Sequence, residues 1–486
     1  MKKIELALED INVQYFAALI FALIAFWMSL LSNAMFYDGD TNWHVATGLW
    51  ILDHGAVPAA DPFSFTAAGH RWITHEWLSE VAMALAFKGF GWSGVRVLTG
   101  LTFALASGVF ARELLRHLTP LSAVLAATLA YEVLAPHVIA RPHAFALPVM
   151  LIFFAELLRA RRANTTPGLW LLPLMVLWAN IHASYIIGLV FLGFFGLDAV
   201  ADSPSGRLRI ALSWLGITAA ATACCLVTPS FIEGFIFPFY LVNMKDLQAI
   251  DEWSPASFGS VTSLEAVILA TIFVLVYKRV QVPPVRLALL LTLVHLTLQH
   301  VRQEIVLASV GAMLLAEPLG RALRAGPRPK TVTPDPATGR RGRALALAAA
   351  AAILATAAVR LAIPEPRVDA SATPVTALAH VPADIRARPV FNDYSFGGWL
   401  IFNHVKTFID GRNDMYGDVL FRQYLDASRG DTVKLAGVFA AYRIGWAILT
   451  PSSAATRWLS HTPGWRVLYR DKWAVVFVRD PPISGR

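Results

Sequence analysis

Long apolar runs are the feature that most constrains this chain. Eleven segments carry few charges and approach the roughly twenty residues that an α-helix needs to cross the hydrocarbon core of a bilayer. They occupy residues 13–35, 94–113, 120–137, 143–158, 168–182, 183–200, 210–228, 263–277, 287–299, 303–319 and 344–363. The sequence therefore predicts a polytopic α-helical membrane protein with about 11 transmembrane helices.

The composition excludes several other classes of protein. Hydrophobic residues make up 56% of the 486 residues and charged residues only 15%, whereas about a quarter of an ordinary soluble domain is charged. The two cysteines, Cys224 and Cys225, are adjacent inside an apolar run. They cannot build a disulfide framework or a cysteine-rich zinc site. A soluble enzyme and a disulfide-stabilised secreted domain are both excluded.

The distribution of positive charge predicts the orientation in the membrane. Lys2 and Lys3 precede the first apolar run, which we interpret as an uncleaved anchor that starts in the cytoplasm. If each following span returns the chain to the other side of the membrane, nineteen of the Lys and Arg residues before residue 344 lie in the cytoplasm and six lie on the opposite face. This is the asymmetry of the positive-inside rule, so the net charge of +8 reflects topology rather than nucleic-acid binding. We expect the cytoplasmic Arg and Lys side chains mainly to snorkel.

The orientation divides the chain into domains. Residues 1–320 form a transmembrane domain with a first external loop at 36–93 and a second at 229–262. The short segment 77–90 contains Glu80 and Lys88, so we expect it to lie in the membrane interface instead of crossing. A basic cytoplasmic linker at 321–343 precedes the last span, 344–363, and residues 364–486 form an extracytoplasmic domain.

The C-terminal region reads as a small α/β domain. Its strands are predicted at 391–393, 407–410, 446–450, 465–469 and 473–478. Helices are predicted between them, at 418–427, 432–442 and 452–459. The last two strands flank a turn at Asp471 and Lys472.

Ionisable residues gather at the external ends of the predicted spans. Such residues are costly near a membrane and therefore indicate function when they converge. Six chain junctions contribute Asp38, Asp40, His44, His75, Glu76, Arg141, His143, His182, Glu252 (with Trp253), His300 and Arg302. Any one of them is usually an interfacial anchor or a cap. Asp38-Gly39-Asp40 suits an Asx turn before a helix that begins near Thr41, and Arg141-Pro142-His143 suits a tight turn or a phosphate receptor.

The first external loop also carries a family resemblance. It reads Asp38-Gly39-Asp40-Thr41-Asn42-Trp43-His44, then Gly48, Ile51, Gly55, Pro58 and Asp61-Pro62-Phe63-Ser64-Phe65. This pattern resembles GT-C membrane glycosyltransferases, namely oligosaccharyltransferase catalytic subunits and, more loosely, protein O-mannosyltransferases and aminoarabinose transferases. Segment 77–90, with Gly91 and Arg96 after it, resembles the amphipathic helix and second span of those enzymes. The whole chain also resembles a group of bacterial membrane proteins.

The resemblance implies inverting transfer of a sugar from a polyprenyl-phosphate-linked donor to a glycan, lipid or protein acceptor. The reaction would take place at the extracytoplasmic face of the bacterial cytoplasmic (inner) membrane. A carboxylate must accept the proton of the acceptor, and cations must stabilise the leaving phosphate. We assign the base to Asp40, with Asp38 second. Phosphate binding is assigned to Arg141, His143, His300 and Arg302, and the acceptor pocket to His44, His75, Glu76, His182, Glu252 and Trp253.

The sequence departs from the family at the metal site. Oligosaccharyltransferases carry a second acidic motif between spans three and four that helps to hold a divalent metal, whereas this junction reads Ala140-Arg141-Pro142-His143. Asp38, Asp40 and Glu252 could still supply oxygen ligands for magnesium or manganese. We expect no essential metal cofactor.

Two motifs in the C-terminal domain have two interpretations each. Residues 392–399 resemble loosely the Trp-Trp-Asp-Tyr-Gly acceptor motif of oligosaccharyltransferases, so Asp393 either contacts substrate or caps the local turn. Asp410 and Arg412 follow a predicted strand. They form either a structural ion pair in an Asp-Gly turn or a contact with the acceptor or donor headgroup.

Two alternatives to the enzyme remain open. A lipid or polysaccharide transporter or flippase would bring ionisable side chains together near the bilayer midplane, often at broken helices in repeated halves. A non-catalytic assembly factor would keep a GT-C-like fold without the reaction, because fold alone does not imply activity.

Overall fold

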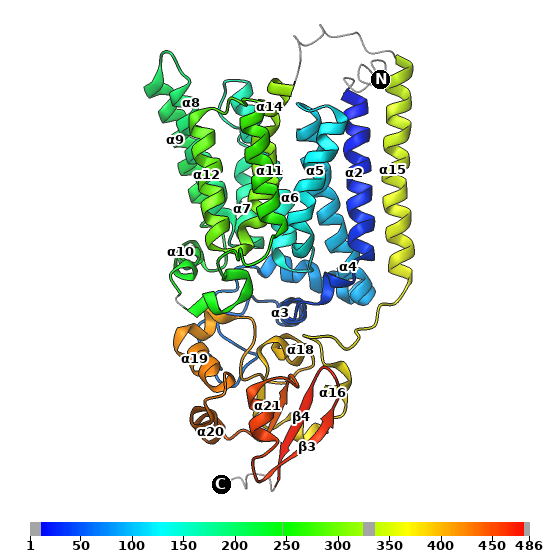
Figure 1. Cartoon of the computed structure of the whole chain (residues 1–486), viewed down its shortest axis with the longest axis vertical. Coiled ribbons are helices and arrows are strands. Elements are labelled where there is room, and N and C mark those ends of the chain that lie inside the picture. Colours follow the sequence, from blue (N-terminus) through cyan, green and yellow to red (C-terminus); the bar gives the residue numbers. More distant parts are fainter. Residues whose placement is uncertain (1–10, 245, 324–335, 481–486) are drawn as a thin grey trace.

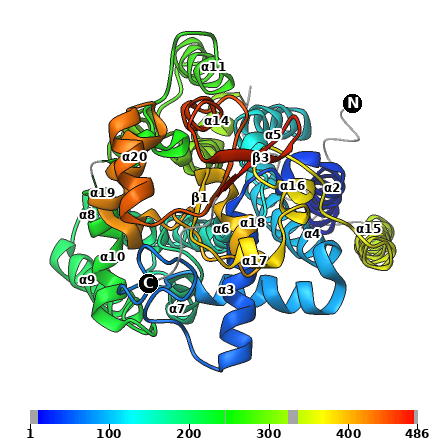
Figure 2. The ribbon, with the colours of Figure 1, turned by 90° about the horizontal axis from the view of Figure 1, so that it is seen from below.

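The computed structural model of the chain describes residues 11–244, 246–323 and 336–480. It consists of a long bundle of helices with a smaller α/β domain at one end (Figure 1). Seen from below, the helices and strands of this C-terminal domain lie over the end of the bundle (Figure 2). We call that end of the bundle the domain-facing end and the opposite one the far end.

Each predicted apolar segment overlaps a helix of the bundle. The bundle helices are α2 (Ile11–Leu31), α4 (Trp77–Leu115), α5 (Pro120–Leu134), α6 (Pro142–Arg162), α7 (Leu171–Ile181), α8 (Tyr185–Ala201), α9 (Arg207–Cys224), α11 (Ser263–Tyr277), α12 (Pro284–Gln299), the run Val301–Leu323 that ends in α14 (Ala312–Leu323), and α15 (Pro336–Ala362). Among the described residues, four helices are long and apolar enough to cross a membrane: Trp77–Leu115, Pro142–Arg162, Val301–Leu323 and Gly342–Ala362. The chain is therefore a membrane protein, and the number of eleven spans stays a prediction.

The bundle has an aromatic core and an apolar outer surface. Phe153, Phe154, Trp178, Phe191 and Phe195 are buried together where α6, α7 and α8 pack. Leu, Val, Ile and Phe side chains on α9 and α11 remain exposed. An apolar surface of this extent suits contact with lipid rather than water. Most of the predicted linker 321–343 lies outside the described residues.

Helix α4 is broken close to the predicted boundary between an interfacial helix and a span. Gly91 has φ of +58°, a left-handed conformation that a side chain disfavours, and Phe90 before it also leaves the helical region. The break divides α4 into an arm that packs against α3 (Asp40–His54) at the domain-facing end and a long arm in the bundle. The segment before the break thus forms a helical arm distinct from the long arm. The expectation that residues 77–90 lie in the membrane interface stays a prediction.

The first loop is part of the core of the C-terminal domain. After α3, Ala67 and Trp72 pack with Phe391 and Phe408 in one buried cluster that also includes Trp43. Backbone hydrogen bonds join the loop to residue Thr407: Phe65 N donates to Thr407 O at 3.2 Å, and Thr407 N donates to Phe63 O at 3.2 Å. The domain therefore needs the loop to complete its core.

The second loop is largely helical. It contains α10 (Phe231–Val242) and two short 3-10 turns, η3 (Asp246–Ala249) and η4 (Asp251–Trp253). The turn η4 packs beside η5 (Val301–Gln303), because Val301 N donates a hydrogen bond to Ser254 O at 3.1 Å. This contact brings the second loop to the junction that follows α12.

The C-terminal domain holds a four-stranded sheet in the order β1-β2-β4-β3. Strand β1 (Val390–Asn392) pairs in parallel with β2 (Trp446–Leu449), while β4 (Val475–Arg479) runs antiparallel to both β2 and β3 (Trp465–Arg470). Every residue of β2 is buried, as expected for an apolar central strand covered on both faces. The helices are α16 (Val375–Ala379), α17 (Ala383–Arg386), α18 (Gly397–Phe402), α19 (Asn413–Ser428), α20 (Thr432–Ala441) and α21 (Ala454–Leu459).

The predicted strand at 407–410 is wrong. Phe408 and Ile409 are fully buried, which is why the segment reads as a strand, but their backbone groups bond to a side chain. Phe408 N donates to Asn392 Oδ1 at 2.9 Å, and Asn392 Nδ2 donates to Ile409 O at 2.8 Å. The buried backbone is thus satisfied without a neighbouring strand.

Candidate functional site

The acidic motif of the first loop is fixed by a turn and a helix start. Asp38 Oδ1 accepts the backbone N–H of Asp40 at 2.9 Å, which is the Asx turn expected from the sequence. Asp40 is the first residue of α3, where the helix dipole favours a negative charge. Gly411 of the C-terminal domain lies against the Asp40 carboxylate so closely that a Cβ at residue 411 would clash with it. Both parts of the protein therefore fix Asp40.

Arg141 is the centre of an ion cluster. Its Nε lies 2.8 Å from Asp38 Oδ2, its Nη1 lies 2.6 Å from Glu252 Oε2, and its Nη2 contacts Asp40 Oδ2. Burial alone would raise the pKa of Glu252, but the guanidinium groups of Arg141 and Arg302 lower it to about 2. Burial raises the pKa of Asp38 despite the opposing effect of Arg141. We call these four residues, Asp38, Asp40, Arg141 and Glu252, the Arg141 cluster.

Arg302 extends the Arg141 cluster towards the second loop. Its guanidinium lies over the Trp253 ring, 4.1 Å from the centroid, and Nη1 is 4.0 Å from Glu252 Oε1. His300 Nδ1 bonds to Trp253 O at 2.9 Å. The junction between α12 and the Val301–Leu323 run thus holds the second loop in place beside the cluster.

A second polar cluster surrounds Glu76. The imidazoles of His182, His75 and His44 lie 3.4, 3.6 and 3.9 Å from its carboxylate, and His44 Nδ1 is also 3.1 Å from Glu80 Oε1. Ser184 N donates to His182 Nδ1 at 3.1 Å, so in the neutral ring it is Nε2–H that faces Glu76. We call Glu76, His44, His75 and His182 the Glu76 cluster.

The charges of the Glu76 cluster follow from its burial. Burial opposes ionisation of Glu76, but the neighbouring imidazoles, His75 first, hold the pKa of this carboxyl well below its usual range. Burial lowers the pKa of His44 to about 4 and that of His182 to about 3. Burial opposes the charged form of His75 as well, but the Glu76 carboxylate raises its pKa above the ordinary value. Near neutral pH the cluster therefore contains one carboxylate and at least two uncharged imidazoles.

The two clusters adjoin through helix α3. Asp40 and His44 are four residues apart and therefore lie on one face of the helix. His143 is close enough to influence the charges of His44, His182 and Glu252, while its own Nε2 bonds to His137 O at 3.0 Å. The six junctions named from the sequence thus meet at the domain-facing end of the bundle.

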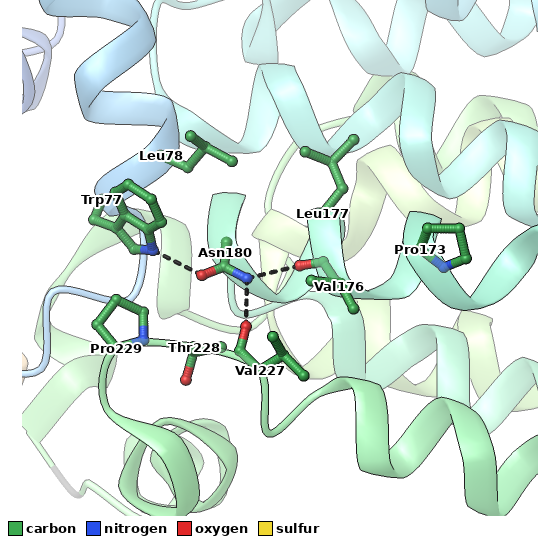
Figure 3. Close-up of a pocket in the computed structure, with 9 residues that line it drawn as sticks. All are labelled: Trp77, Leu78, Pro173, Val176, Leu177, Asn180, Val227, Thr228 and Pro229. Atoms are coloured by element: carbon green, nitrogen blue, oxygen red, sulfur yellow. Dashed lines mark hydrogen bonds between the residues drawn. The ribbon is translucent and has the colours of Figure 1, made fainter.

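An open, mostly apolar pocket of about 580 Å³ is lined in part by Trp77, the residue that follows Glu76 (Figure 3). Within it, Asn180 accepts a hydrogen bond from Trp77 Nε1 and donates to Val176 O and Val227 O, each at 2.8 Å. Trp77 follows Glu76 in the chain, and Asn180 lies two residues before His182. The lining residues are Trp77, Leu78, Pro173, Val176, Leu177, Asn180, Val227, Thr228 and Pro229.

The fold of this chain resembles a solved oligosaccharyltransferase structure. The crystal structure of the oligosaccharyltransferase of Archaeoglobus fulgidus in the apo form superposes with a TM-score of 0.53 at 12% sequence identity. The match covers 89% of this chain and 69% of that one. The chain has a GT-C-like fold. No family model and no curated protein matches the sequence, so the likeness is one of fold alone.

In this GT-C-like fold, the candidate residues of the C-terminal domain form hydrogen bonds and ion pairs within the protein, and their contact with substrate stays a prediction. Arg412 is fully buried, with Nη1 at 2.6 Å from Asp61 Oδ1 and Nε at 2.7 Å from Asp410 Oδ1. Asp393 accepts hydrogen bonds from Ser395 N at 3.1 Å and from Thr450 Oγ1 at 3.0 Å. These contacts correspond to the structural interpretation of each motif.

Three residues of the C-terminal domain that belong to the two predicted motifs but were not assigned to the site lie near the clusters. Asn413 Nδ2 donates to the Tyr394 hydroxyl at 2.5 Å, and Asn413 Oδ1 is buried and has no hydrogen-bond partner within the part of the chain that the structure describes. Burial raises the pKa of Asp414 to about 6, and His75 and Glu76 are among the charges that act on it. Asn413-Asp414 directly follows Asp410-Gly411-Arg412 at the start of α19, which is the sequence signal that could have drawn attention to them.

Proposed function

We propose that this protein is an inverting glycosyltransferase that uses a polyprenyl-phosphate-linked sugar as donor. The acceptor is a glycan, a lipid or a protein at the extracytoplasmic face of a bacterial cytoplasmic membrane. The observation that carries the proposal is the position of Asp40, held between Arg141 and Gly411 where the GT-C-like bundle meets the C-terminal domain. The oligosaccharyltransferase-like fold supports the same reaction class.

In the proposed reaction, Asp40 accepts the proton of the acceptor hydroxyl or amide. The deprotonated acceptor atom attacks the anomeric carbon, and the bond from that carbon to the phosphate oxygen breaks on the opposite face. The phosphate leaves with the electron pair, so the configuration at the anomeric carbon inverts. Arg141 Nη2 contacts the Asp40 carboxylate, and a positive charge at this distance favours the ionised form, which is the one that can act as a base.

The leaving phosphate needs a cation with free hydrogen-bond donors. All three nitrogens of the Arg141 guanidinium already contact carboxylates, so its assignment as a phosphate ligand remains a prediction. Arg302 makes one ion pair, a long one to Glu252 at 4.0 Å, among the described residues. We therefore assign binding of the leaving phosphate to Arg302, together with His300 beside it.

Amphiphilic substrates suit the surroundings of the site. The apolar pocket lined by Trp77 and Leu177 provides a place for part of a polyprenyl chain, while the Glu76 cluster keeps its assignment to the acceptor. On the side of the C-terminal domain, Asn413 Oδ1, which has no partner among the described residues, can accept a hydrogen bond from the incoming substrate.

The first experiment tests the base. Asp40→Asn removes the proton acceptor but keeps the shape of the side chain, so we expect transfer to fall by about 10²- to 10⁴-fold with folding intact. Asp53→Asn is the matched control, because Asp53 lies on the same helix with its side chain 66% exposed. Full transfer by the Asp40→Asn variant would remove the catalytic assignment.

Transfer is measured in membrane vesicles from cells that lack the endogenous protein. Radiolabelled sugars on polyprenyl monophosphate and diphosphate are compared, and label is followed from the lipid fraction to the acceptor fraction. Donor binding without transfer by the wild-type chain would support the assembly factor. Movement of a labelled polyprenyl lipid across the vesicle membrane would support the flippase.

A further inference from the structure

The Arg141 cluster gathers three negative side chains around one positive one. The carboxylates come from the turn before α3, from the first residue of α3 and from η4 of the second loop, while Arg141 precedes α6. Each guanidinium nitrogen contacts a different carboxylate: Nε that of Asp38, Nη2 that of Asp40 and Nη1 that of Glu252. The guanidinium therefore occupies the point at which the three carboxylates face one another.

Electrostatics require a cation at this point. Three carboxylates converging in a partly buried site repel one another, and without a positive charge the repulsion would protonate or separate them. Arg302 is the next cation, but among the carboxylates of the described residues it forms an ion pair with Glu252 alone, at 4.0 Å. Asp38 and Asp40 thus depend on Arg141.

The backbone around Arg141 fixes the position of its side chain. Arg141 is extended, with φ of −132° and ψ of 162°, and Pro142 after it restricts it to that region. Ala140 N donates a hydrogen bond to Met35 O at 3.0 Å, which ties this junction to the segment that leads into Asp38. The guanidinium and two of its carboxylates are thus held by one local backbone arrangement.

A divalent metal does not fit these residues. Its ligands would be Asp38, Asp40 and Glu252, at about 2.0 to 2.6 Å from their oxygens. That position is filled by the Arg141 guanidinium, and Arg is a permanent cation that cannot act as a metal ligand. Across residues 11–244, 246–323 and 336–480, no group of three or more His, Cys, Asp or Glu side chains is arranged to hold a metal ion.

We propose that Arg141 is a built-in cation that takes the place of a divalent metal between Asp38, Asp40 and Glu252. The wild-type chain then has no use for a divalent cation at this site. Removing the guanidinium leaves three carboxylates facing an empty position, which is the ligand set that Mn²⁺ or Mg²⁺ prefers. The proposal concerns the cation site itself and does not depend on sugar transfer.

The test measures Mn²⁺ binding by the full-length chain purified in detergent, with the electron paramagnetic resonance signal of free Mn²⁺ as readout. We expect Arg141→Ala to bind Mn²⁺ at least about tenfold more tightly than the wild type, because three uncompensated carboxylates attract the ion. Adding Glu252→Gln to Arg141→Ala should remove that gain. Arg141→Lys, which keeps a positive charge, and Arg302→Ala, which leaves Arg141 in place, should show no gain.

Gel filtration and the thermal unfolding temperature establish that each variant is folded, and Arg141→Gln is the second variant should Arg141→Ala fail to fold. A folded Arg141→Ala or Arg141→Gln protein that gains no Mn²⁺ affinity overturns the proposal. Micromolar Mn²⁺ binding by the wild type that Glu252→Gln abolishes also overturns it, whatever the Arg141 variants do. Because neither readout involves transfer, failure of the proposed enzyme function would leave these results unchanged.

Discussion

The two ends of the helical bundle use ion pairs in opposite ways. At the far end, Asp198 of α8 accepts hydrogen bonds from Arg161 Nε at 2.9 Å and Arg286 Nε at 3.1 Å. One carboxylate is shared by two cations, and the side chains of Asp198, Arg161 and Arg286 are only 3%, 5% and 10% exposed. At the domain-facing end one cation, Arg141, is shared by three carboxylates that are 14–33% exposed.

This difference distinguishes ion pairs that stabilise the fold from ion pairs at the proposed reaction site. The far-end pairs join helices α6, α8 and α12 directly, and their groups are sealed from solvent. The Arg141 cluster joins loops and the C-terminal domain, adjoins the histidines of the Glu76 cluster and keeps its carboxylates partly accessible. A variant at the far end should therefore affect stability, and a variant at the domain-facing end should affect the reaction.

The largest stability effect is expected for Asp198→Asn. It removes the buried carboxylate that Arg161 and Arg286 share and leaves them only Asp202 at 2.7 Å and Glu317 at 3.6 Å, so we expect a loss of up to about 3–5 kcal/mol in the free energy of unfolding. Asp202→Asn is the matched control, because Asp202 contacts the same Arg161 at 2.7 Å but is 61% exposed, so its loss should cost less than about 1 kcal/mol. Thermal unfolding in detergent measures both, and equal losses would contradict the contrast between the two ends.

Gly411→Ala, at the domain-facing end, should lower the rate of the reaction rather than the stability of the fold. The added Cβ meets the Asp40 carboxylate and displaces the proposed base, and a displacement of about 1 Å can lower a rate by about 100-fold. Gly437→Ala on α20 is the control, since a Cβ at that position would meet no atom of residues 11–244, 246–323 or 336–480 within 4 Å. An Asp40-dependent transfer rate that survives Gly411→Ala unchanged would show that the close contact has no role in positioning the base.

The smallest effect is expected for Asp414→Asn and depends on pH. Burial raises the pKa of Asp414 to about 6, from an ordinary value of 3.8 for an unfolded chain. The folded state thus holds the proton more tightly, and the wild type loses stability relative to the variant as pH rises from about 4 to about 6. At pH 7.5 the variant should be more stable than the wild type by on the order of 1 kcal/mol.

Thermal unfolding of the Asp414→Asn variant and the wild type at pH 4 and pH 7.5 checks this prediction. The difference in stability between the variant and the wild type removes the contribution of the other titrating groups, because the two proteins share them. Asp53→Asn, at an exposed position, should show the same difference from the wild type at both pH values. A pH-independent difference for Asp414→Asn would show that the carboxyl is not destabilised by burial.

Much of the architecture follows from the sequence because it is local. A continuous apolar run both favours the membrane and satisfies its own backbone hydrogen bonds as a helix, so the predicted segments coincide with helices. The alternation of spans also predicted which junctions share a face, and Arg141 does meet Asp38, Asp40 and Glu252.

Other features escaped the sequence because they depend on distant partners. The sequence predicts that cytoplasmic side chains such as Arg161 and Arg286 snorkel, but each forms an ion pair with the Asp198 carboxylate on a neighbouring helix. The segment 407–410 has the composition of a strand, but the Asn392 side chain and the first loop satisfy its backbone instead. Neither partner is visible in the local pattern.

The sequence by itself determined the helical segments, the break near Gly91 and the collection of ionisable residues at one end of the bundle. Each depends on residue types within a few turns of chain. Only the tertiary structure decided that the Arg141 guanidinium stands between three carboxylates, and that Arg412 pairs with Asp61 from 351 residues away. Which side chains form such pairs depends on how distant segments pack in the folded chain. An ion pair requires two groups to lie within a few ångströms in space, and this can occur at any spacing in the sequence.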